Sequence, residues 1–179
     1  MSAEKEFKNL GADFETAPFS VIVDTREQAP YGFKGLRVRI RKTELPLVVL
    51  CERRKLDSGD YSIDGMENEI SIERKSLDDA LATFTNGHER FERELERLQK
   101  LKWAAILLEF EWSRILRLPA DRNIPPQAID GMIMAWQQRF PKVHWIWRPG
   151  RGHAEKACVN ILRRYWAEST GHRVHWTII

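Results

Sequence analysis

Short apolar and β-branched runs, some with polar residues at every second position, predict strands in the first part of the chain. Residues 19–24 (FSVIVD) are typical of a buried strand. Residues 35–41 (GLRVRIR) alternate apolar and arginine side chains, which predicts a half-exposed strand with a positive outer face. The same pattern indicates further strands at residues 47–51, 53–56 and 69–75.

Helical spacing replaces this alternation after residue 75. Ser76 and Asp79 match the S-x-x-D pattern of a helix start, and apolar residues then recur at helical spacing. Residues 85–87 (TNG) should interrupt this helix, and the apolar stripe resumes at residues 91–98. The helix start also gives Asp79 a purely structural explanation, as an acidic residue favoured by the helix dipole.

The rest of the chain alternates strands and helices. Residues 103–110 (WAAILLEF) are nearly all apolar, so we expect a central strand covered on both faces. The other expected elements are a short helix or turn at 112–118, a helix over 127–140 opened by Pro126, a strand at 143–148, an amphipathic helix at 153–169 and a last strand at 174–179. This order predicts an α/β fold with a central mixed sheet flanked by helices.

Length and composition favour one soluble domain. The 179 residues suffice for a core, and we expect a polar arm at residues 1–18 and a single domain at 19–179. No signal peptide and no apolar run of about 20 residues is evident, so a cytoplasmic protein without a membrane segment is expected. The two cysteines, Cys51 and Cys158, lack metal-binding spacing, which argues against a zinc site or a disulfide framework.

The distribution of charge along the chain indicates where a nucleic-acid-binding face could lie. The formal net charge is only +3, so any nucleic-acid surface must come from local clustering. The predicted strand at 35–41 and its flanks carry such a cluster, which we call the basic stripe: Lys34, Arg37, Arg39 and Arg41. A solvated strand face is the ordinary explanation of the basic stripe, and contact with phosphate is the alternative.

Three carboxylates and one lysine are candidates for hydrolytic chemistry. Asp24 ends a predicted buried strand, Asp60 follows Gly59, and Glu73 and Lys75 share one face of the strand at 69–75. Hard oxygen ligands suit Mg²⁺ or Mn²⁺, which can activate water and neutralise charge in phosphodiester hydrolysis. A turn residue at a strand end and the polar face of a surface strand are the ordinary explanations.

The order of these residues carries a more specific resemblance. The segments VDTRE (23–27), GDY (59–61) and ERKSLDD (73–79) are similar to the motifs of the XPF/Hef family of structure-specific endonucleases. The resemblance extends from about residue 21 to about residue 165. It implies a restriction-endonuclease-like core, in a short bacterial or phage form without helix-hairpin-helix or helicase domains, and a cytoplasmic location in a bacterial or phage-infected cell.

The resemblance also implies roles at the matching positions. Three carboxylates would hold Mg²⁺ or Mn²⁺: Asp24, Asp60 and Glu73. Lys75 would be the catalytic lysine. A supporting charged network would consist of Arg26, Glu27, Arg74 and Asp79. Strict alternation puts Arg74 on the strand face opposite Glu73, which favours an ion-pair role for Arg74 over contact with the metal.

The chain departs from the family pattern at residue 88. This chain has Gly87-His88 where the family typically has Gly-Arg, so His88 and Arg90 are the candidates for a phosphate contact there. DNA is the expected partner, and a protein that recruits the chain to its site is left open. Five of the seven Trp lie at or after residue 136, and core packing or a homodimer through C-terminal elements would explain them.

The sequence therefore predicts a metal-dependent DNA endonuclease. Selectivity for branched, flap or fork DNA, in repair, recombination or phage DNA processing, is what the resemblance implies. The main alternative is a non-catalytic DNA-binding or scaffolding subunit on the same fold. A plain protein–protein module is a third hypothesis, and it predicts no salt-sensitive DNA binding.

Overall fold

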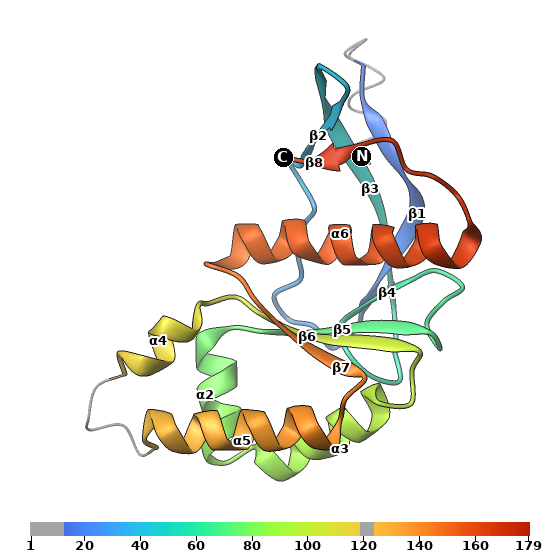
Figure 1. The fold of residues 1–179 in the computed structure, drawn as a ribbon. Coiled ribbons are helices and arrows are strands. Elements are labelled where there is room, and N and C mark those ends of the chain that lie inside the picture. Colours follow the sequence, from blue (N-terminus) through green and yellow to red (C-terminus); the bar gives the residue numbers. More distant parts are fainter. Residues whose placement is uncertain (1–12, 119–123) are drawn as a thin grey trace.

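The computed structural model describes residues 13–118 and 124–179. Within them, eight strands form one mixed sheet in the order β7-β6-β5-β4-β1-β3-β2-β8 (Figure 1). The strands are β1 (Glu15–Asp24), β2 (Arg37–Ile40), β3 (Thr43–Arg54), β4 (Tyr61–Ile63), β5 (Ile70–Lys75), β6 (Trp103–Leu108), β7 (Val143–Trp147) and β8 (Thr177–Ile178). Neighbours β5, β6 and β7 run parallel, as do β1 and β3, whereas β4 runs antiparallel to both of its neighbours.

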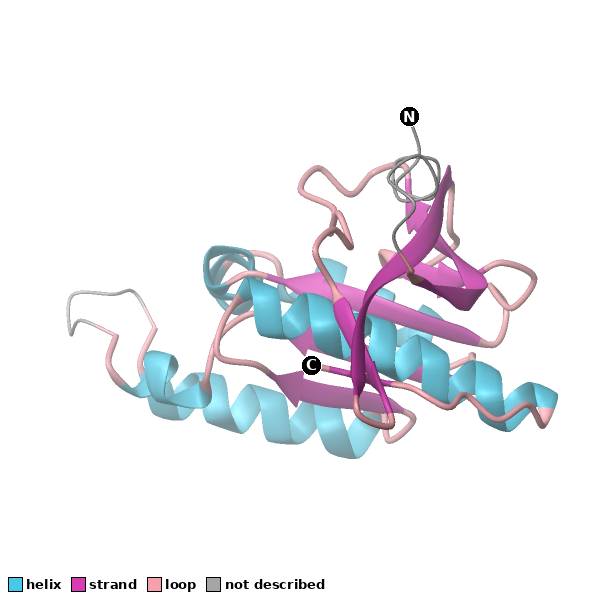
Figure 2. Cartoon of the chain, turned by 90° about the horizontal axis from the view of Figure 1, so that it is seen from above, coloured by secondary structure: helices cyan, strands magenta, loops and turns pink. Residues whose placement is uncertain are grey.

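Helices cover both faces of this sheet (Figures 1 and 2). The helices are α2 (Leu77–Thr85), α3 (His88–Leu98), α4 (Trp112–Leu116), α5 (Pro126–Arg139) and α6 (Arg151–Thr170). The long α6 packs on one face, against β1, β4, β5 and β6, while α2, α3 and α5 pack on the other, against β5, β6 and β7. The predicted mixed sheet flanked by helices is confirmed.

Each face of the sheet has its own hydrophobic core. Under α6, buried Ala154 and Leu162 pack with Val21 of β1 and with Ile70 and Ile72 of β5. The second core lies between the sheet and α2, α3 and α5. The alternation along β5 thus gives one core its isoleucines and leaves the opposite side of the strand for polar residues.

The break between α2 and α3 lies where the sequence indicates. Ser76 is the N-cap of α2, and its hydroxyl accepts a hydrogen bond from the Asp79 main-chain N–H. The chain turns at Asn86 and Gly87, where a Cβ on Gly87 would lie 3.2 Å from the carbonyl oxygen of Ala82. The turn lets α3 pack against β6 with Phe91, Leu95 and Leu98 buried, and this fixes the position of its polar face.

Three strands differ from expectation, and one of them, β4, was not predicted. β1 begins at Glu15, so residues 15–18 of the predicted polar arm belong to the sheet, while residues 1–12 of that arm lie outside the described residues. Pairing with β3 explains the extension, because Glu15 and Thr16 lie opposite Leu47 and Val48. β3 is one continuous strand of 12 residues where two shorter ones were expected, because it pairs with β1 on one side and β2 on the other.

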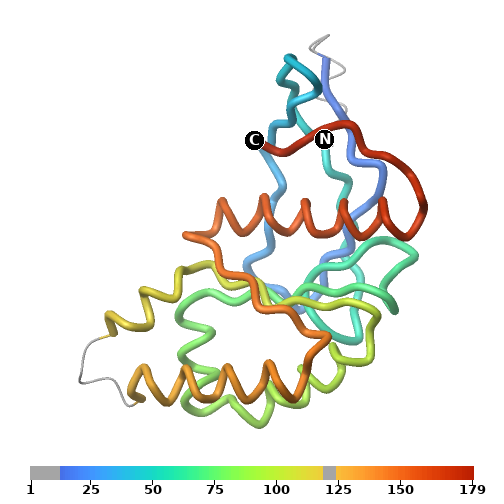
Figure 3. Tube along the Cα trace, viewed as in Figure 1, coloured from blue at the N-terminus to red at the C-terminus, as the bar shows by residue number. Residues whose placement is uncertain are grey.

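The basic stripe lies far from the predicted catalytic residues. Arg39 of β2 pairs with Glu44 near the start of β3, whereas Asp24 of β1 pairs with Arg54 at its end. The ten residues from 44 to 54 correspond to about 33 Å of strand. The chain after α6 returns to this same end, where Thr177 of β8 pairs with Arg39 (Figure 3).

Candidate active site

Three strand ends meet where the candidate carboxylates lie. The main-chain N–H of Asp24, at the end of β1, donates to the carbonyl of Asp60 (2.8 Å), and the N–H of Asp60 donates to the carbonyl of Ile72 in β5 (2.8 Å). Gly59 is required here because its φ is +72° and a Cβ would lie 2.1 Å from the Ser71 hydroxyl oxygen. The Gly-Asp pair therefore holds Asp60 between β1 and β5.

Asp60, Glu73 and Lys75 form one corner of the site, which we call the acidic corner. Oδ2 of Asp60 accepts a hydrogen bond from the Arg74 main-chain N–H (2.7 Å), and Lys75 Nζ lies 3.2 Å from Glu73 Oε1. Burial and the nearby Glu73 charge raise the pKa of Asp60 well above its usual 3.8. Burial also raises the pKa of Glu73 despite the neighbouring Lys75.

Lys75 is held between charge and an aromatic ring. Its ammonium nitrogen lies 4.6 Å from the centroid of the Phe91 ring in α3, and its side chain is 11% exposed. Glu73, the partner of Lys75, is 17% exposed, so the pair is not completely closed off from solvent. The acidic corner is thus largely desolvated, and this strengthens its electrostatic interactions.

Asp24 has very different surroundings. Its carboxylate accepts four hydrogen bonds, from the main-chain N–H, Nε and Nη2 of Arg26 (2.7, 2.8 and 3.0 Å) and from the main-chain N–H of Leu56 (2.6 Å). Burial alone would raise the pKa of Asp24, but these hydrogen bonds outweigh it and lower the pKa below 3.8. The side chain is 1% exposed, so Asp24 serves here as the anchor of Arg26 and Leu56.

Arg74 lies on the opposite strand face and forms an ion-pair network. Its guanidinium donates through Nε and Nη2 to the two carboxylate oxygens of Glu109 (2.8 and 2.9 Å), and Nη1 lies 3.5 Å from Glu27. Arg151, in the first turn of α6, also approaches Glu109 (3.4 Å). Arg74 and Glu27 therefore link β5 to the loop after β1 and, through Glu109, to α6.

The sequence did not indicate Glu94 of α3. Its Oε1 accepts a hydrogen bond from the main-chain N–H of Gly59 (2.8 Å), and its other carboxylate oxygen pairs with Arg97. The charge of Glu94 is one cause of the raised pKa of Glu73. On the sequence, Glu94 is one of many charges on a solvated helix face, and only the packing of α3 brings it to Gly59.

The remaining predicted residues lie outside the acidic corner. Asp79 is exposed, and its carboxylate accepts a hydrogen bond from the Ser76 hydroxyl (2.6 Å), which completes the helix cap. His88 and Arg90 are exposed in the first turn of α3. The basic stripe is exposed at the far end of β3, where Arg39 pairs with Glu44.

The donor set fits a divalent cation at two carboxylates. Within residues 13–118 and 124–179, no three His, Cys, Asp or Glu side chains are grouped closely enough to hold a metal ion. Asp60 and Glu73 combine adjacent carboxylates, raised pKa values and partial exposure. Mg²⁺ commonly takes one or two carboxylates and keeps several waters, which matches this pair. The ligand set with Asp24 stays a prediction.

The chain is similar to known proteins in sequence and in fold. The family model described as ERCC4 domain matches residues 23–154. Among solved structures, the chain is similar to XPF from Aeropyrum pernix, with a TM-score of 0.59 and 16% sequence identity, over 85% of this chain and 67% of that chain. A search of the curated proteins finds no match. The predicted restriction-endonuclease-like architecture is confirmed. None of the helices in the described part of the chain could cross a membrane.

Proposed function

The chain belongs to the ERCC4-domain family, and from this premise we propose that it is a divalent-metal-dependent endodeoxyribonuclease. The observation that carries the proposal is the geometry of the acidic corner, where Lys75 Nζ lies 3.2 Å from Glu73 Oε1 and the Arg74 main-chain N–H holds the Asp60 carboxylate from the same strand (2.7 Å). Such concentrated negative charge favours binding of a cation, and a cation-binding pair beside an ammonium group suits reaction at a phosphodiester.

Each residue of the acidic corner has a defined task in this proposal. Asp60 and Glu73 would hold Mg²⁺ or Mn²⁺, which when bound would supply an activated water and neutralise charge on the phosphate. Lys75 donates hydrogen bonds to the phosphate oxygens that gain charge as the nucleophile attacks. Its contact with Glu73 and its position over Phe91 keep the ammonium group aimed at that place.

The surrounding residues position this corner. Asp24 keeps Arg26 and Leu56 in place, and the Arg26 side chain is 59% exposed next to the acidic corner, where it can contact a DNA phosphate. Glu94 holds Gly59 and thereby the backbone before Asp60. Arg74 fastens β5 through Glu109. These contacts leave Asp60, Glu73 and Lys75 as the reacting groups.

DNA would also contact the basic stripe. The separation of about 33 Å along β3 corresponds to about ten base pairs of duplex at 3.4 Å per step. We therefore propose that the basic stripe contacts the backbone about one helical turn from the cleaved bond. The same proposal includes selectivity for branched, flap or fork DNA and a role in repair, recombination or phage DNA processing. It also includes a homodimer through C-terminal elements and a cytoplasmic location.

A substrate panel tests the activity. Labelled duplex, flap, fork and single-stranded DNA are incubated with Mg²⁺, Mn²⁺ or EDTA, in parallel with an Asp60→Asn variant purified identically. We expect cleavage that requires the metal and is lost in the variant. Metal-independent cleavage, or equal cleavage by the variant, would contradict the proposal. Tight, salt-sensitive DNA binding without cleavage of any substrate would instead identify a DNA-binding subunit.

A further inference from the structure

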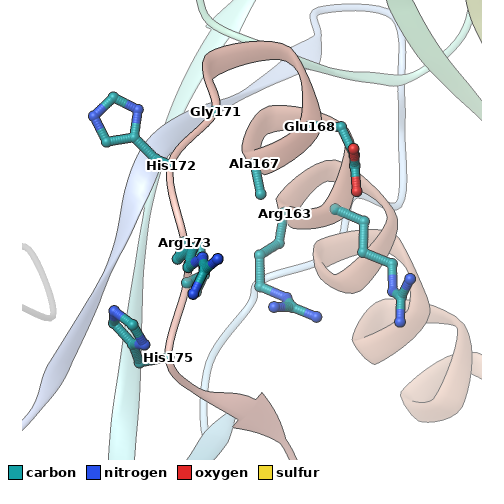
Figure 4. Close-up of a pocket in the computed structure, with 9 residues that line it drawn as sticks. Arg163, Ala167, Glu168, Gly171, His172, Arg173 and His175 are labelled. Atoms are coloured by element: carbon teal, nitrogen blue, oxygen red, sulfur yellow. The ribbon is translucent and has the colours of Figure 1, made fainter.

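A pocket at the end of α6 carries an excess of positive charge. It has a volume of about 480 Å³ and lies between the last turns of α6 and the segment at 171–175 (Figure 4). Arg163 and Arg164 line it from the helix, and Arg173 lines it from the returning segment. Among the described residues that line it, Glu168 is the one acidic residue, so three guanidinium groups face a single carboxylate.

Arg163 is the residue that makes this pocket unusual. Its Nε is buried and has no hydrogen-bond partner within the described part of the chain. Its guanidinium carbon lies 5.2 Å from the centroid of the Trp176 ring, which holds the group against the wall of the pocket. Burial and the neighbouring charge of Arg164 lower the pKa of Arg163. A partly buried cation is costly without a counter-charge, and an anion in the pocket that Arg163 lines would supply one.

We infer that this pocket binds a phosphate group at a site separate from the active site. Guanidinium groups match phosphate oxygens in paired hydrogen bonds, and three of them from two walls can surround one tetrahedral anion. The volume exceeds that of a free phosphate ion, so the group can be attached to a larger molecule. From Arg151 beside Glu109 to Arg163 there are 12 residues, or about 18 Å of helix, which separates the two sites.

The position of the pocket suggests where the phosphate comes from. Thr177, two residues after the pocket residue His175, pairs with Arg39 of the basic stripe. The pocket and the basic stripe therefore lie at the same end of the molecule. A phosphodiester of bound DNA is one source, and this part of the inference rests on the proposed function. A small phosphorylated molecule is the other source, and it is independent of any cleavage.

Phosphate binding is measured first, on the intact chain. Calorimetric titration with inorganic phosphate is compared with titration by chloride at equal ionic strength. We expect binding that is weakened at least tenfold in the double variant Arg164→Gln/Arg173→Gln, whose two positions lie at the surface and should leave the fold intact. The matched control is Lys100→Gln/Lys142→Gln, which removes two exposed charges elsewhere. Circular dichroism and thermal melting verify that all proteins are folded.

DNA binding then distinguishes the two sources. Fluorescence anisotropy in EDTA measures affinity for labelled duplex DNA at several salt concentrations. If DNA supplies the phosphate, the double variant binds more weakly than the control, and the slope of log affinity against log salt falls by about one for each phosphate that is no longer neutralised. If the two variants bind DNA alike but only the pocket variant fails to bind phosphate, a small molecule is the ligand. Absence of phosphate binding by the unmodified protein, or equal binding by both variants, overturns the inference.

Failure of this inference and failure of the proposed function give different results. Removal of the pocket charges leaves the rate of metal-dependent cleavage at saturating DNA in place, because none of the pocket arginines belongs to the acidic corner, even if more DNA is then needed for saturation. A protein that binds phosphate in the pocket but cleaves no DNA would retain the inference and lose the proposed function.

Discussion

Asp24 and Asp60 lie at adjoining strand ends, yet their surroundings differ in every respect that matters for chemistry. Asp24 accepts four hydrogen bonds, is almost fully buried and has a lowered pKa. Oδ2 of Asp60 accepts a hydrogen bond from the Arg74 main chain, and beside Glu73 its pKa is raised. A carboxylate with satisfied oxygens stabilises structure, whereas one facing another carboxylate favours binding of a cation.

The largest expected effect is on cleavage by the acidic corner. Asp60→Asn keeps an acceptor for the Arg74 N–H but removes one of the two negative charges proposed to bind the metal. We expect single-turnover cleavage at saturating Mg²⁺ to fall about 1,000-fold, since metal assistance is worth several kcal/mol and each 1.36 kcal/mol is tenfold. Urea unfolding in EDTA should show no loss of stability, because a buried repulsion is relieved. A clear loss of stability would show that Asp60 resembles Asp24 after all.

Removal of the Lys75 ammonium group should reduce the cleavage rate somewhat less than Asp60→Asn does. Lys75→Met keeps the aliphatic stem over Phe91 and removes the ammonium group that we propose contacts the phosphate. We expect cleavage to fall about 100-fold, the magnitude typical of losing one charge-stabilising donor. DNA affinity in EDTA, measured by anisotropy, should change by less than threefold. A large loss of affinity with little loss of rate would assign Lys75 to binding.

Substitution of Asp24 should affect stability more than cleavage, the reverse of what we expect for Asp60. Asp24→Asn replaces an acceptor of four hydrogen bonds by an amide whose NH₂ faces donors. We expect the free energy of unfolding to fall by about 1–3 kcal/mol in urea titrations. Cleavage should fall less than in Asp60→Asn when both are assayed below their unfolding transitions. Equal losses of cleavage, with metal affinity weakened in both, would support the predicted three-carboxylate metal site.

The pH dependence of stability tests separately whether the ionised form of Asp24 stabilises the fold. Since the pKa of Asp24 is lowered on folding, its ionised form contributes stability fully above the unfolded value of about 3.8, and this contribution is lost as pH falls through the lower folded value. The difference in unfolding free energy between the unmodified protein and Asp24→Asn should therefore be constant above about pH 5 and shrink below 3.8. A difference that grows on acidification would contradict this sign.

The smallest effect is expected at Glu94. Glu94→Ala leaves the Gly59 N–H without its acceptor and removes a negative charge near Glu73. We expect unfolding free energy to fall by about 1 kcal/mol and the Mg²⁺ concentration at half-maximal rate to rise a few-fold. Glu94→Gln retains the acceptor, so it should restore stability but leave the higher Mg²⁺ requirement. Identical behaviour of the two variants would exclude this positioning role.

Local patterns account for most of the elements. The capping pattern at Ser76, the break at Gly87 and the apolar stripe of α3 are short-range features, and each lies where predicted. Strand limits were less predictable, since β1 and β3 extend through polar residues wherever a neighbouring strand pairs with them. The alternation along β5 correctly separated Arg74 from the face of Glu73 and Lys75.

The sequence by itself determined the fold class, most of the elements and the candidates Asp24, Asp60, Glu73 and Lys75, because periodicity and motif spacing are properties of neighbouring residues. Only the tertiary structure decided which aspartate has all its oxygens hydrogen-bonded and which lies beside another carboxylate. Leu56 reaches Asp24, and Glu73 reaches Asp60, from other segments of the chain. The tertiary structure also brought Glu94 to Gly59 and folded Arg173 back toward Arg163. These are contacts between segments that are distant in the sequence. A short motif therefore does not predict which of its oxygen atoms or guanidinium groups will lack a hydrogen-bond partner in the folded protein.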